Sequence, residues 1–122
     1  MSAVLIVDDE ALIRWFVAES LETAGYQILE AGCAREALAY FQVGGNPVAV
    51  VVLDLKLPDS SDLGLLRQIQ HLAPSCRIIL MTAHGTPELL NEALLAGAFA
   101  VLPKPFDVTK VQGLVRDALL AA

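Results

Sequence analysis

Five polar side chains, each following an apolar run, could together bind a metal ion and a phosphoryl group. They are Asp8, Asp9, Asp54, Thr82 and Lys104. Three carboxylates placed close together repel one another unless they are protonated or a cation neutralises them. Oxygen ligands of this kind suit a hard cation, and Mg²⁺ is the first expectation. Aspartate also forms aspartyl-phosphate intermediates, whose chemistry needs charge neutralisation and in-line placement more than acid–base groups.

Asp54 is the central residue of this set because it ends the apolar run 48–53, Val-Ala-Val-Val-Val-Leu. A strand that is apolar at every position must be covered on both faces, which is typical of a central strand in a parallel sheet. Open α/β sheets bind ligands beyond the carboxyl ends of their strands. We therefore expect Asp54 at that edge, with the other four side chains beside it.

Strand and helix patterns alternate five times along the chain, which predicts an α/β fold with a parallel sheet and helices on both faces. Gly25 and Gly97 are expected to end two helices, and Thr86 with its following proline to start another. Segment 59–61 is expected to cap the third helix, and Asp107 the last. The predicted strands are 3–7, 26–30, 48–53, 77–81 and 99–102, and the predicted helices are about 10–24, 34–43, a helix ending near 72, 86–97 and 107–120.

The composition indicates one domain over residues 1–122, because no linker or repeat divides the chain. Hydrophobic residues make up 56% of it, yet its longest apolar runs are well short of the about 18 residues that a membrane-spanning helix needs. A net charge of −6 without any cluster of Lys and Arg disfavours nucleic acid and anionic membranes as partners. Cys33 and Cys76 lack metal-site spacing and are expected to be reduced thiols in a cytoplasmic protein.

The first predicted helix has two faces of different character. Trp15 lies on one face, where we expect it to be exposed beside the acidic edge and available to a partner protein. Six residues share the opposite face, which should be buried: Ile13, Phe16, Val17, Ser20, Leu21 and Ala24.

Five short motifs stand at the ends of successive predicted strands. They are Asp8-Asp9, Asp54 followed by Leu57-Pro58, Thr82-Ala83, Gly97-Ala98-Phe99 and Lys104-Pro105-Phe106. In this order they resemble the receiver (CheY-like) domains of two-component response regulators, and the resemblance covers essentially the whole chain. It implies a flavodoxin-like (βα)5 fold, with a five-stranded parallel sheet in the order 2-1-3-4-5.

The resemblance implies that Asp54 is the site of phosphorylation by a partner histidine kinase. Asp9 and Asp54 would then bind Mg²⁺ directly and Asp8 mainly through water. The backbone carbonyl of Lys56 would complete the set of metal ligands.

The resemblance also implies how the phosphoryl group is held and how its arrival is signalled. Thr82 and the amide of Ala83 would bind the phosphoryl oxygens, and Lys104 would pair with them. Pro105 resembles the family's proline after a cis peptide bond, which aims the lysine inward. The family usually has Tyr or Phe at the position of Val101, where the ring rotates inward on phosphorylation. This sequence departs from that aromatic switch, while the movement of Thr82 could remain.

In family terms the chain is expected to be a phosphoacceptor switch and not an enzyme, although it could catalyse its own phosphorylation from small phosphodonors and its own dephosphorylation. Phosphorylation would change the surface formed by the fourth helix, the fifth strand and the fifth helix. Expected partners are a sensor histidine kinase or histidine phosphotransferase, an output domain in a longer chain, and a second copy of this chain on activation. The run 57–61, Leu-Pro-Asp-Ser-Ser, resembles receivers attached to NtrC-type, sigma-54-dependent transcription activators.

Two other classes of function fit parts of the pattern. A pseudo-receiver would mediate protein contacts without phosphorylation; Val101 favours it, but such domains are expected to lose acids or the lysine. A phosphatase of the haloacid-dehalogenase type would need a second carboxylate two residues after Asp54, where this chain has Lys56, and no cap domain is present.

Overall fold

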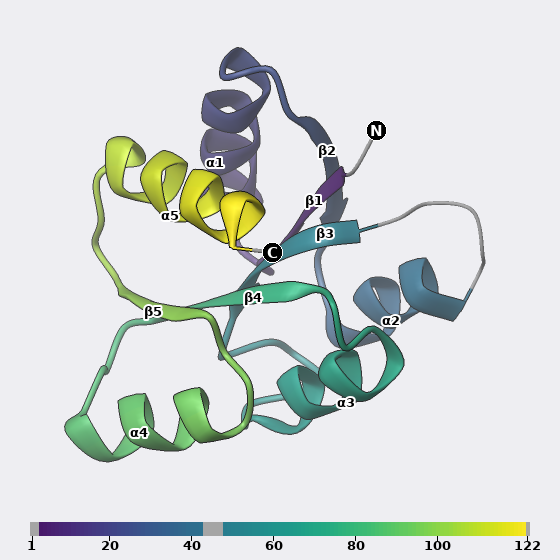
Figure 1. The fold of residues 1–122 in the computed structure, drawn as a ribbon, viewed down its shortest axis with the longest axis vertical. Coiled ribbons are helices and arrows are strands. Elements are labelled where there is room, and N and C mark those ends of the chain that lie inside the picture. Colours follow the sequence, from purple (N-terminus) through teal and green to yellow (C-terminus); the bar gives the residue numbers. More distant parts are fainter. Residues whose placement is uncertain (1–2, 43–47, 122) are drawn as a thin grey trace.

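The structure, a computed structural model, describes residues 3–42 and 48–121, in which strands and helices alternate as predicted (Figure 1). The predicted end of the second helix at Val43, with Gly44-Gly45 after it, lies outside the described residues. No helix in the described ranges combines the length and apolarity needed to cross a membrane. The elements are β1 (Ala3–Val7), α1 (Ala11–Thr23), β2 (Gln27–Ala31), α2 (Ala34–Gln42), β3 (Val48–Asp54), α3 (Gly64–Leu72), β4 (Arg77–Thr82), α4 (Pro87–Leu95), β5 (Ala100–Pro103) and α5 (Val108–Leu120).

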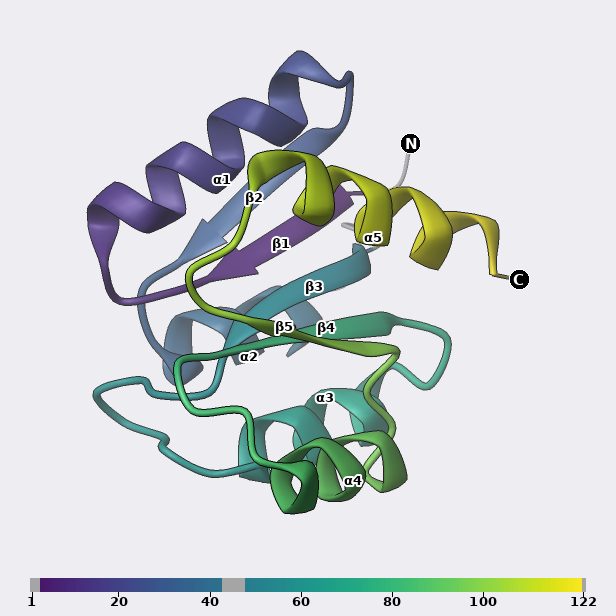
Figure 2. The same cartoon turned by 90° about the vertical axis from the view of Figure 1, so that its left-hand side faces the viewer.

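The five strands lie parallel in one sheet with the order β2-β1-β3-β4-β5, which confirms the predicted topology. β3 is the central strand, and its last residue, Asp54, pairs with Met81 of β4. α1 and α5 cover one face of the sheet, whereas α2, α3 and α4 cover the other (Figures 1 and 2). The carboxyl ends of all the strands therefore meet at the edge that the sequence marks with polar side chains.

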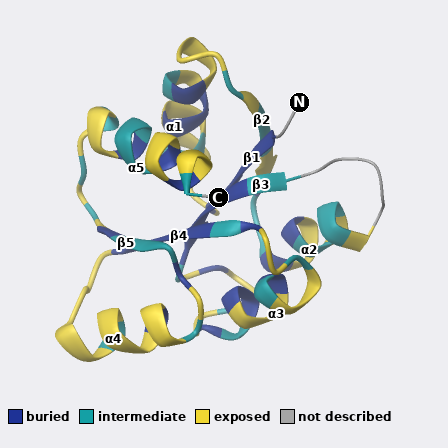
Figure 3. Cartoon of the chain, in the orientation of Figure 1, coloured by how far each residue is buried: buried dark blue, intermediate teal, exposed yellow. Residues whose placement is uncertain are grey.

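Two cores, one on each face of the sheet, share the same strands, because successive side chains of a strand point to opposite faces. Most residues of β1, β3 and β4 are buried (Figure 3). Val51 and Leu53 join the core under α2 and α3, whereas Val50 and Val52 join the core under α1 and α5. The apolar run before Asp54 thus holds this carboxylate on a strand that is packed from both faces.

The predicted helix ends are mostly confirmed. Gly25 and Gly97 have φ angles of 98° and 111°, a left-handed conformation that favours glycine after a helix. The hydroxyl of Thr86 accepts a hydrogen bond from the amide of Leu89 at 3.1 Å and caps α4. Asp107 occupies the N-cap position of α5 but makes no side-chain cap hydrogen bond.

The predicted cap of α3 is wrong. Residues 59–61 do not start this helix, because the chain first makes a tight turn in which Leu57 and Ser60 exchange backbone hydrogen bonds of 2.8 and 3.3 Å. α3 begins only at Gly64, whose amide donates to Asp62 Oδ1 at 2.8 Å.

Asp59 instead caps α2, from a distant part of the chain. Its two carboxylate oxygens accept hydrogen bonds from the amides of Ala34, at 2.8 Å, and Arg35, at 3.0 Å. These hydrogen bonds lower the pKa of Asp59 below its ordinary value. The cap explains how α2 begins after Cys33, a residue type that rarely caps helices.

Asp59→Ala is expected to lower Tm by about 3 to 5 °C, because two amides of α2 lose their partners. A carboxylate with a lowered folded-state pKa stabilises the fold above its unfolded pKa, near 3.8, and loses this effect as the pH falls. The difference from the unaltered protein should therefore shrink below pH 4, and hydrogen exchange should show lost protection at Ala34 and Arg35. Asp62→Ala, which removes a carboxylate that accepts a hydrogen bond from the amide of Gly64, is the control and should leave both amides protected. Unchanged exchange at these amides in Asp59→Ala would contradict the cap.

α1 follows its predicted faces except at Phe16 and at Ala24, which lies just past the end of the helix and is exposed. Val17 and Leu21 are buried and Trp15 is 56% exposed, as predicted. Phe16 was expected to be buried, but it is 49% exposed. It lies beside the β5–α5 loop, in a hollow that it shares with Phe106, rather than under the sheet.

Candidate functional site

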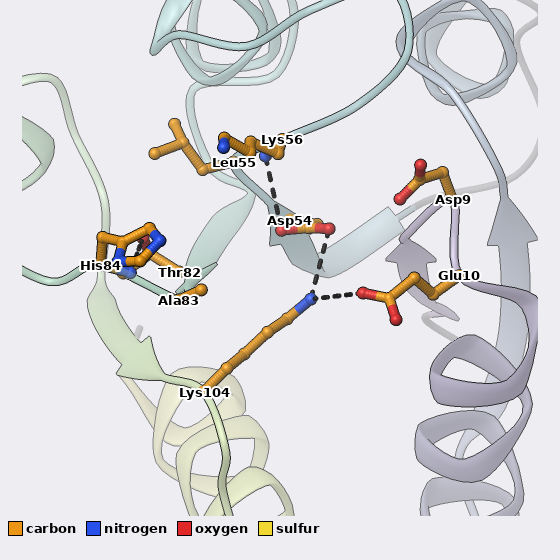
Figure 4. Close-up of a pocket in the computed structure, with 9 residues that line it drawn as sticks. All are labelled: Asp9, Glu10, Asp54, Leu55, Lys56, Thr82, Ala83, His84 and Lys104. Atoms are coloured by element: carbon orange, nitrogen blue, oxygen red, sulfur yellow. Dashed lines mark hydrogen bonds and ion pairs between the residues drawn. The ribbon is translucent and has the colours of Figure 1, made fainter.

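Polar groups from four strand ends line one cavity at the carboxyl edge of the sheet (Figure 4). Asp54 reaches the cavity from β3, Thr82 from β4 and Lys104 from the loop after β5. The structure thus brings together side chains that are far apart in the sequence. The cavity has a volume of about 390 Å³ and is lined by Asp9, Glu10, Asp54, Leu55, Lys56, Thr82, Ala83, His84 and Lys104.

The ammonium group of Lys104 is the electrostatic centre of the site. Its Nζ lies 3.2 Å from Asp8 Oδ2, 3.3 Å from Asp54 Oδ2 and 3.7 Å from Glu10 Oε1. The side chains of Asp8 and Asp54 are buried, whereas that of Glu10 is exposed. One cation thus offsets two buried carboxylates, and a second cation would neutralise the remaining negative charge.

Burial and crowding change the pKa values in this cluster. Burial, and then the carboxylate of Asp8, raise the pKa of Asp54, and the attraction of Lys104 only partly offsets them. Burial alone would lower the pKa of Lys104, but the carboxylates of Asp8 and Asp54 outweigh it and raise this pKa. Lys104 is therefore held as a cation near neutral pH, and the charge of Asp54 is costly to keep.

Two backbone hydrogen bonds join the loops of the site. The amide of Leu55 donates to the carbonyl of Met81 at 3.1 Å and fixes the chain directly after Asp54. The amide of Lys104 donates to the carbonyl of Thr82 at 2.7 Å. This hydrogen bond joins the end of β4, which carries Thr82, directly to the loop that carries Lys104.

The predicted phosphoryl-binding groups lie on two sides of Asp54 in Figure 4, with Thr82 and Ala83 on one side and Lys104 on another. Thr82 is buried, and its hydroxyl oxygen accepts a hydrogen bond from the amide of His84 at 3.2 Å. Lys104 approaches Asp54 from another side, and the cis peptide bond expected before Pro105 is present.

Asp8, Glu10 and Asp54, which we call the acidic set, each place a carboxylate oxygen within 4.8 Å of the others. Three such oxygens fit a hard cation such as Mg²⁺. Asp9 was expected to be a direct ligand, yet its exposed side chain only lines the cavity and lies outside the acidic set. Metal ligation by Asp9 and by the backbone carbonyl of Lys56 stays a prediction.

Glu10 was not among the predicted site residues. Its backbone is extended, with φ −80° and ψ 101°, so its side chain leaves the chain on the same side as that of Asp8. Its amide also donates to Asp8 Oδ1 at 2.9 Å. The alternation of side chains in an acidic run that continues a strand is the signal that could have identified it.

The two cysteines lie outside this cavity. Both are free thiols, as predicted, with Cys76 buried and Cys33 half-buried. Burial raises the pKa of Cys76 to about 12, which leaves its thiol unreactive near neutral pH.

The sequence matches the response regulator receiver domain family over residues 4–116. The chain belongs to this family. This receiver domain is 34% identical over 116 residues to the DNA-binding transcriptional regulator NtrC of Salmonella typhimurium, covering 95% of this chain and 24% of NtrC. It is 31% identical over 116 residues to sporulation initiation phosphotransferase F of Bacillus subtilis, covering 95% of this chain and 92% of that protein.

Solved structures of receiver domains share the fold. A CheY-like receiver domain protein from Methanospirillum hungatei superposes with a TM-score of 0.90 at 29% identity, over 98% of this chain and 94% of that chain. The beryllofluoride-activated NtrC4 receiver domain dimer superposes with a TM-score of 0.88 at 30% identity, over 98% of each chain. This receiver domain therefore spans about a quarter of the length of the NtrC relative. Receiver domains of response regulators act as switches under the control of phosphorylation, and this is the functional class of the chain.

Proposed function

We propose that Asp54 accepts a phosphoryl group from a histidine kinase or a histidine phosphotransferase. The observation that carries this proposal is its place at the end of the central strand, in a cavity shared with Thr82 and Lys104. Asp54 Oδ2 is held by Lys104, whereas Oδ1 accepts only a long hydrogen bond, of 3.4 Å, from the amide of Lys56 within the described ranges. Oδ1 is therefore the oxygen better placed to attack phosphorus.

In the proposed transfer, an oxygen of Asp54 attacks the phosphorus of a phosphohistidine. The O–P bond forms as the N–P bond breaks, and the imidazole leaves with the electron pair and takes a proton from solvent. Water later attacks the same phosphorus, which releases inorganic phosphate and restores the carboxylate. Small phosphodonors such as acetyl phosphate would serve in the same way, so the domain would catalyse its own phosphorylation without a partner kinase.

The acidic set is the proposed Mg²⁺ site, with Asp9 and the backbone carbonyl of Lys56 as further ligands on the family pattern. Bound Mg²⁺ would neutralise negative charge on the transferring phosphoryl group. Lys104 adds a fixed positive charge from the protein itself, 3.3 Å from Asp54. The two charges explain how a nucleophilic carboxylate and a phosphoryl group could approach each other.

The proposed switch starts from the about 1.5 to 2 negative charges that phosphorylation adds at this edge. Lys104 can leave Asp8 to pair with a phosphoryl oxygen, and the hydroxyl of Thr82 can turn away from the amide of His84 to donate to another. The hydrogen bond between the backbones of Thr82 and Lys104 couples these movements. Val101 has no ring that could rotate inward, so the signal would leave through Thr82 and α4.

The proposed output surface is formed by α4, β5 and α5. Ala93 is the buried residue of α4, whereas Leu90, Leu94 and Leu95 of this helix are exposed. An apolar surface of this kind suits a partner that covers it. The dimeric state of the activated NtrC4 receiver supports a second copy of this chain as one such partner, and the NtrC relative supports an output domain in a longer protein.

The mass of the intact protein after incubation with acetyl phosphate and Mg²⁺ tests the proposed function. We expect a gain of one phosphoryl group, located at Asp54 by peptide mapping, and a stable complex with beryllofluoride. A protein that shows neither would be a pseudo-receiver. Val101 is the feature in favour of that alternative. Against it, Glu10, Asp54, Thr82 and Lys104 line one cavity, and Asp8 lies directly behind it, 3.2 Å from Lys104.

An apolar area of α1 beside the site supports docking of the phosphoryl donor there. Leu12 is 77% exposed, and Trp15 and Phe16 are about half exposed. A hollow of about 350 Å³ next to Phe16 is also lined by Lys104 and Ala83, two of the phosphoryl-binding residues. A protein seated on α1 could therefore present its phosphohistidine to the cavity.

Trp15→Ala is expected to slow phosphotransfer from the cognate kinase about tenfold, because exposed tryptophans are frequent anchors of protein interfaces. The rate with acetyl phosphate should stay the same, since Trp15 does not line the cavity. Leu95→Ala, which removes an even more exposed apolar side chain from α4, is the control and should change neither rate. Equal slowing with both donors would show that Trp15 acts on the site itself and not on docking.

A further inference from the structure

One arginine holds the acidic β1–α1 loop from outside the cavity. Arg14 of α1 donates from Nη1 to the backbone carbonyl of Asp8 at 2.7 Å. From Nε it donates to the carboxylate of Glu30, near the end of β2, at 3.1 Å. The fork of a single guanidinium thus joins the loop that carries the acids to the neighbouring strand.

The surroundings of Arg14 fix its guanidinium in this place. A Cβ atom at Gly32 would lie only 3.3 Å from Nη1, so the glycine leaves the room that the guanidinium occupies. Glu36 closes the β2–α2 turn by accepting a hydrogen bond from the amide of Gly32 at 2.7 Å. The hydroxyl of Tyr40 donates to the backbone carbonyl of Glu30 at 3.0 Å. This hydrogen bond holds the backbone of the residue whose carboxylate binds Arg14. The groups bound by these hydrogen bonds belong to Asp8, Glu30 and Gly32, which are not among the residues that line the cavity.

We infer that Arg14 is a positioning residue, which sets the backbone of Asp8 so that the acidic set can bind Mg²⁺. This inference rests on the proposed function, in which that set is the metal site. The backbone of Asp8 is held from two sides, by its own amide on the carbonyl of Ala31 at 3.1 Å and by Arg14 on its carbonyl. Without Arg14 the loop can relax in the direction that separates three like charges.

Replacement of Arg14 should change Mg²⁺ affinity in opposite directions, depending on whether Arg14 acts by positioning the loop or only by its charge. Groups that orient metal ligands typically contribute about 10- to 100-fold to affinity, and Arg14 acts one step further out, on the backbone. We therefore expect Arg14→Gln to bind Mg²⁺ about tenfold more weakly. If only the charge of Arg14 mattered, removal of a cation beside three acids would tighten Mg²⁺ binding instead.

The experiment is a Mg²⁺ titration followed by the backbone amide NMR signals of residues 8–10, with acetyl phosphate labelling over the same Mg²⁺ range. In Arg14→Gln both midpoints should move about tenfold to higher Mg²⁺, while the labelling rate at saturating Mg²⁺ stays within about twofold. Arg14→Lys keeps the charge without the fork and should fall between the two proteins. It also carries the test if Arg14→Gln does not fold.

Arg77→Gln is the matched control. Arg77 donates to the backbone carbonyl of Ala121 from Nε at 3.1 Å and from Nη2 at 2.7 Å, at the amino end of β4, opposite the site. Its loss removes an arginine bound to a backbone carbonyl, as in Arg14→Gln, and should leave Mg²⁺ affinity unchanged. Unchanged or tighter Mg²⁺ binding by the Arg14 variants overturns the inference alone. An unaltered protein without Mg²⁺-dependent shifts overturns the proposed metal site and the inference with it.

Discussion

Asp54→Asn is expected to abolish phosphorylation by acetyl phosphate and, at the same time, to raise the thermal stability of the domain. Asparagine keeps the shape of the side chain but offers no carboxylate to attack phosphorus. Among the residues that the structure describes, no other acid that lines the cavity is the last residue of a strand. The mass of the protein should therefore show no phosphoryl group after any incubation time.

The gain in stability follows from the raised pKa of Asp54. A carboxyl group with a raised folded-state pKa contributes most stability below its unfolded pKa, near 3.8, and loses this contribution as the pH rises through the folded-state pKa. At pH 7 the ionised group destabilises the fold, mainly through its burial and then through Asp8. Asparagine removes this charge, and we expect Tm to rise by about 2 to 5 °C.

Calorimetry with EDTA at pH 7 and pH 5 measures the difference between the two proteins. The difference should shrink at pH 5, because Asp54 becomes more protonated there. Asp107→Asn is the control, since Asp107 is exposed and makes no side-chain cap hydrogen bond, and neither its Tm nor its phosphorylation should change. Asp54→Asn protein that is still labelled, or that melts at a lower temperature, would contradict the assignment of Asp54.

The sheet could be predicted more closely than the helix starts, for a physical reason. Runs that are apolar at every position need cover on both faces, so β1, β3 and β4 are visible in the sequence alone. The outer strands β2 and β5 begin one residue later than predicted, at Gln27 and Ala100, because their patterns are weaker. The start of α3 could not be predicted, because Asp59 bonds to α2, at an amide 25 residues away in the chain. A hydrogen bond between distant loops produces no periodic pattern in the sequence, so sequence patterns do not predict it.

The members of the site were predictable to the extent that parallel strands end at one edge. That rule places Asp8, Asp54, Thr82 and Lys104 together, as observed. It does not say which of two adjacent acids turns inward, and here the extended backbone of Glu10 directs that side chain to the site. Local dihedral angles and the packing of loops decide such details.

Lys104→Met is expected to destabilise the metal-free domain and to make its stability depend on Mg²⁺. Methionine keeps much of the aliphatic length but removes the cation that lies 3.2 Å from Asp8 and 3.3 Å from Asp54. Removal of one partner from a buried ion pair typically costs about 3 to 5 kcal/mol. The ammonium is partly hydrated, so we expect a loss of about 2 kcal/mol at pH 7.5 in EDTA.

The pH dependence of this loss has a definite sign. Lys104 has a raised pKa, so its ion pairs stabilise the unaltered protein fully below the unfolded pKa of 10.5, and the effect is lost as the pH rises through the folded-state pKa. At the acid end, protonation of Asp54, whose pKa is also raised, relieves the repulsion that Lys104→Met leaves behind. The difference in Tm between the two proteins should therefore be larger at pH 8 than at pH 5.

Mg²⁺ should restore most of the stability of Lys104→Met, because it supplies positive charge to the same carboxylates. Phosphorylation should nevertheless stay slow at saturating Mg²⁺, since the proposed partner of the phosphoryl oxygens is gone. Lys110→Met, which removes an exposed lysine of α5, is the control and should behave like the unaltered protein. If Mg²⁺ stabilised Lys104→Met no more than this control, the ammonium and the metal would not neutralise the same carboxylates, which would contradict the prediction. The expected result instead makes Lys104 the internal counter-ion of the metal-free site, which phosphorylation then frees to bind the new phosphoryl group.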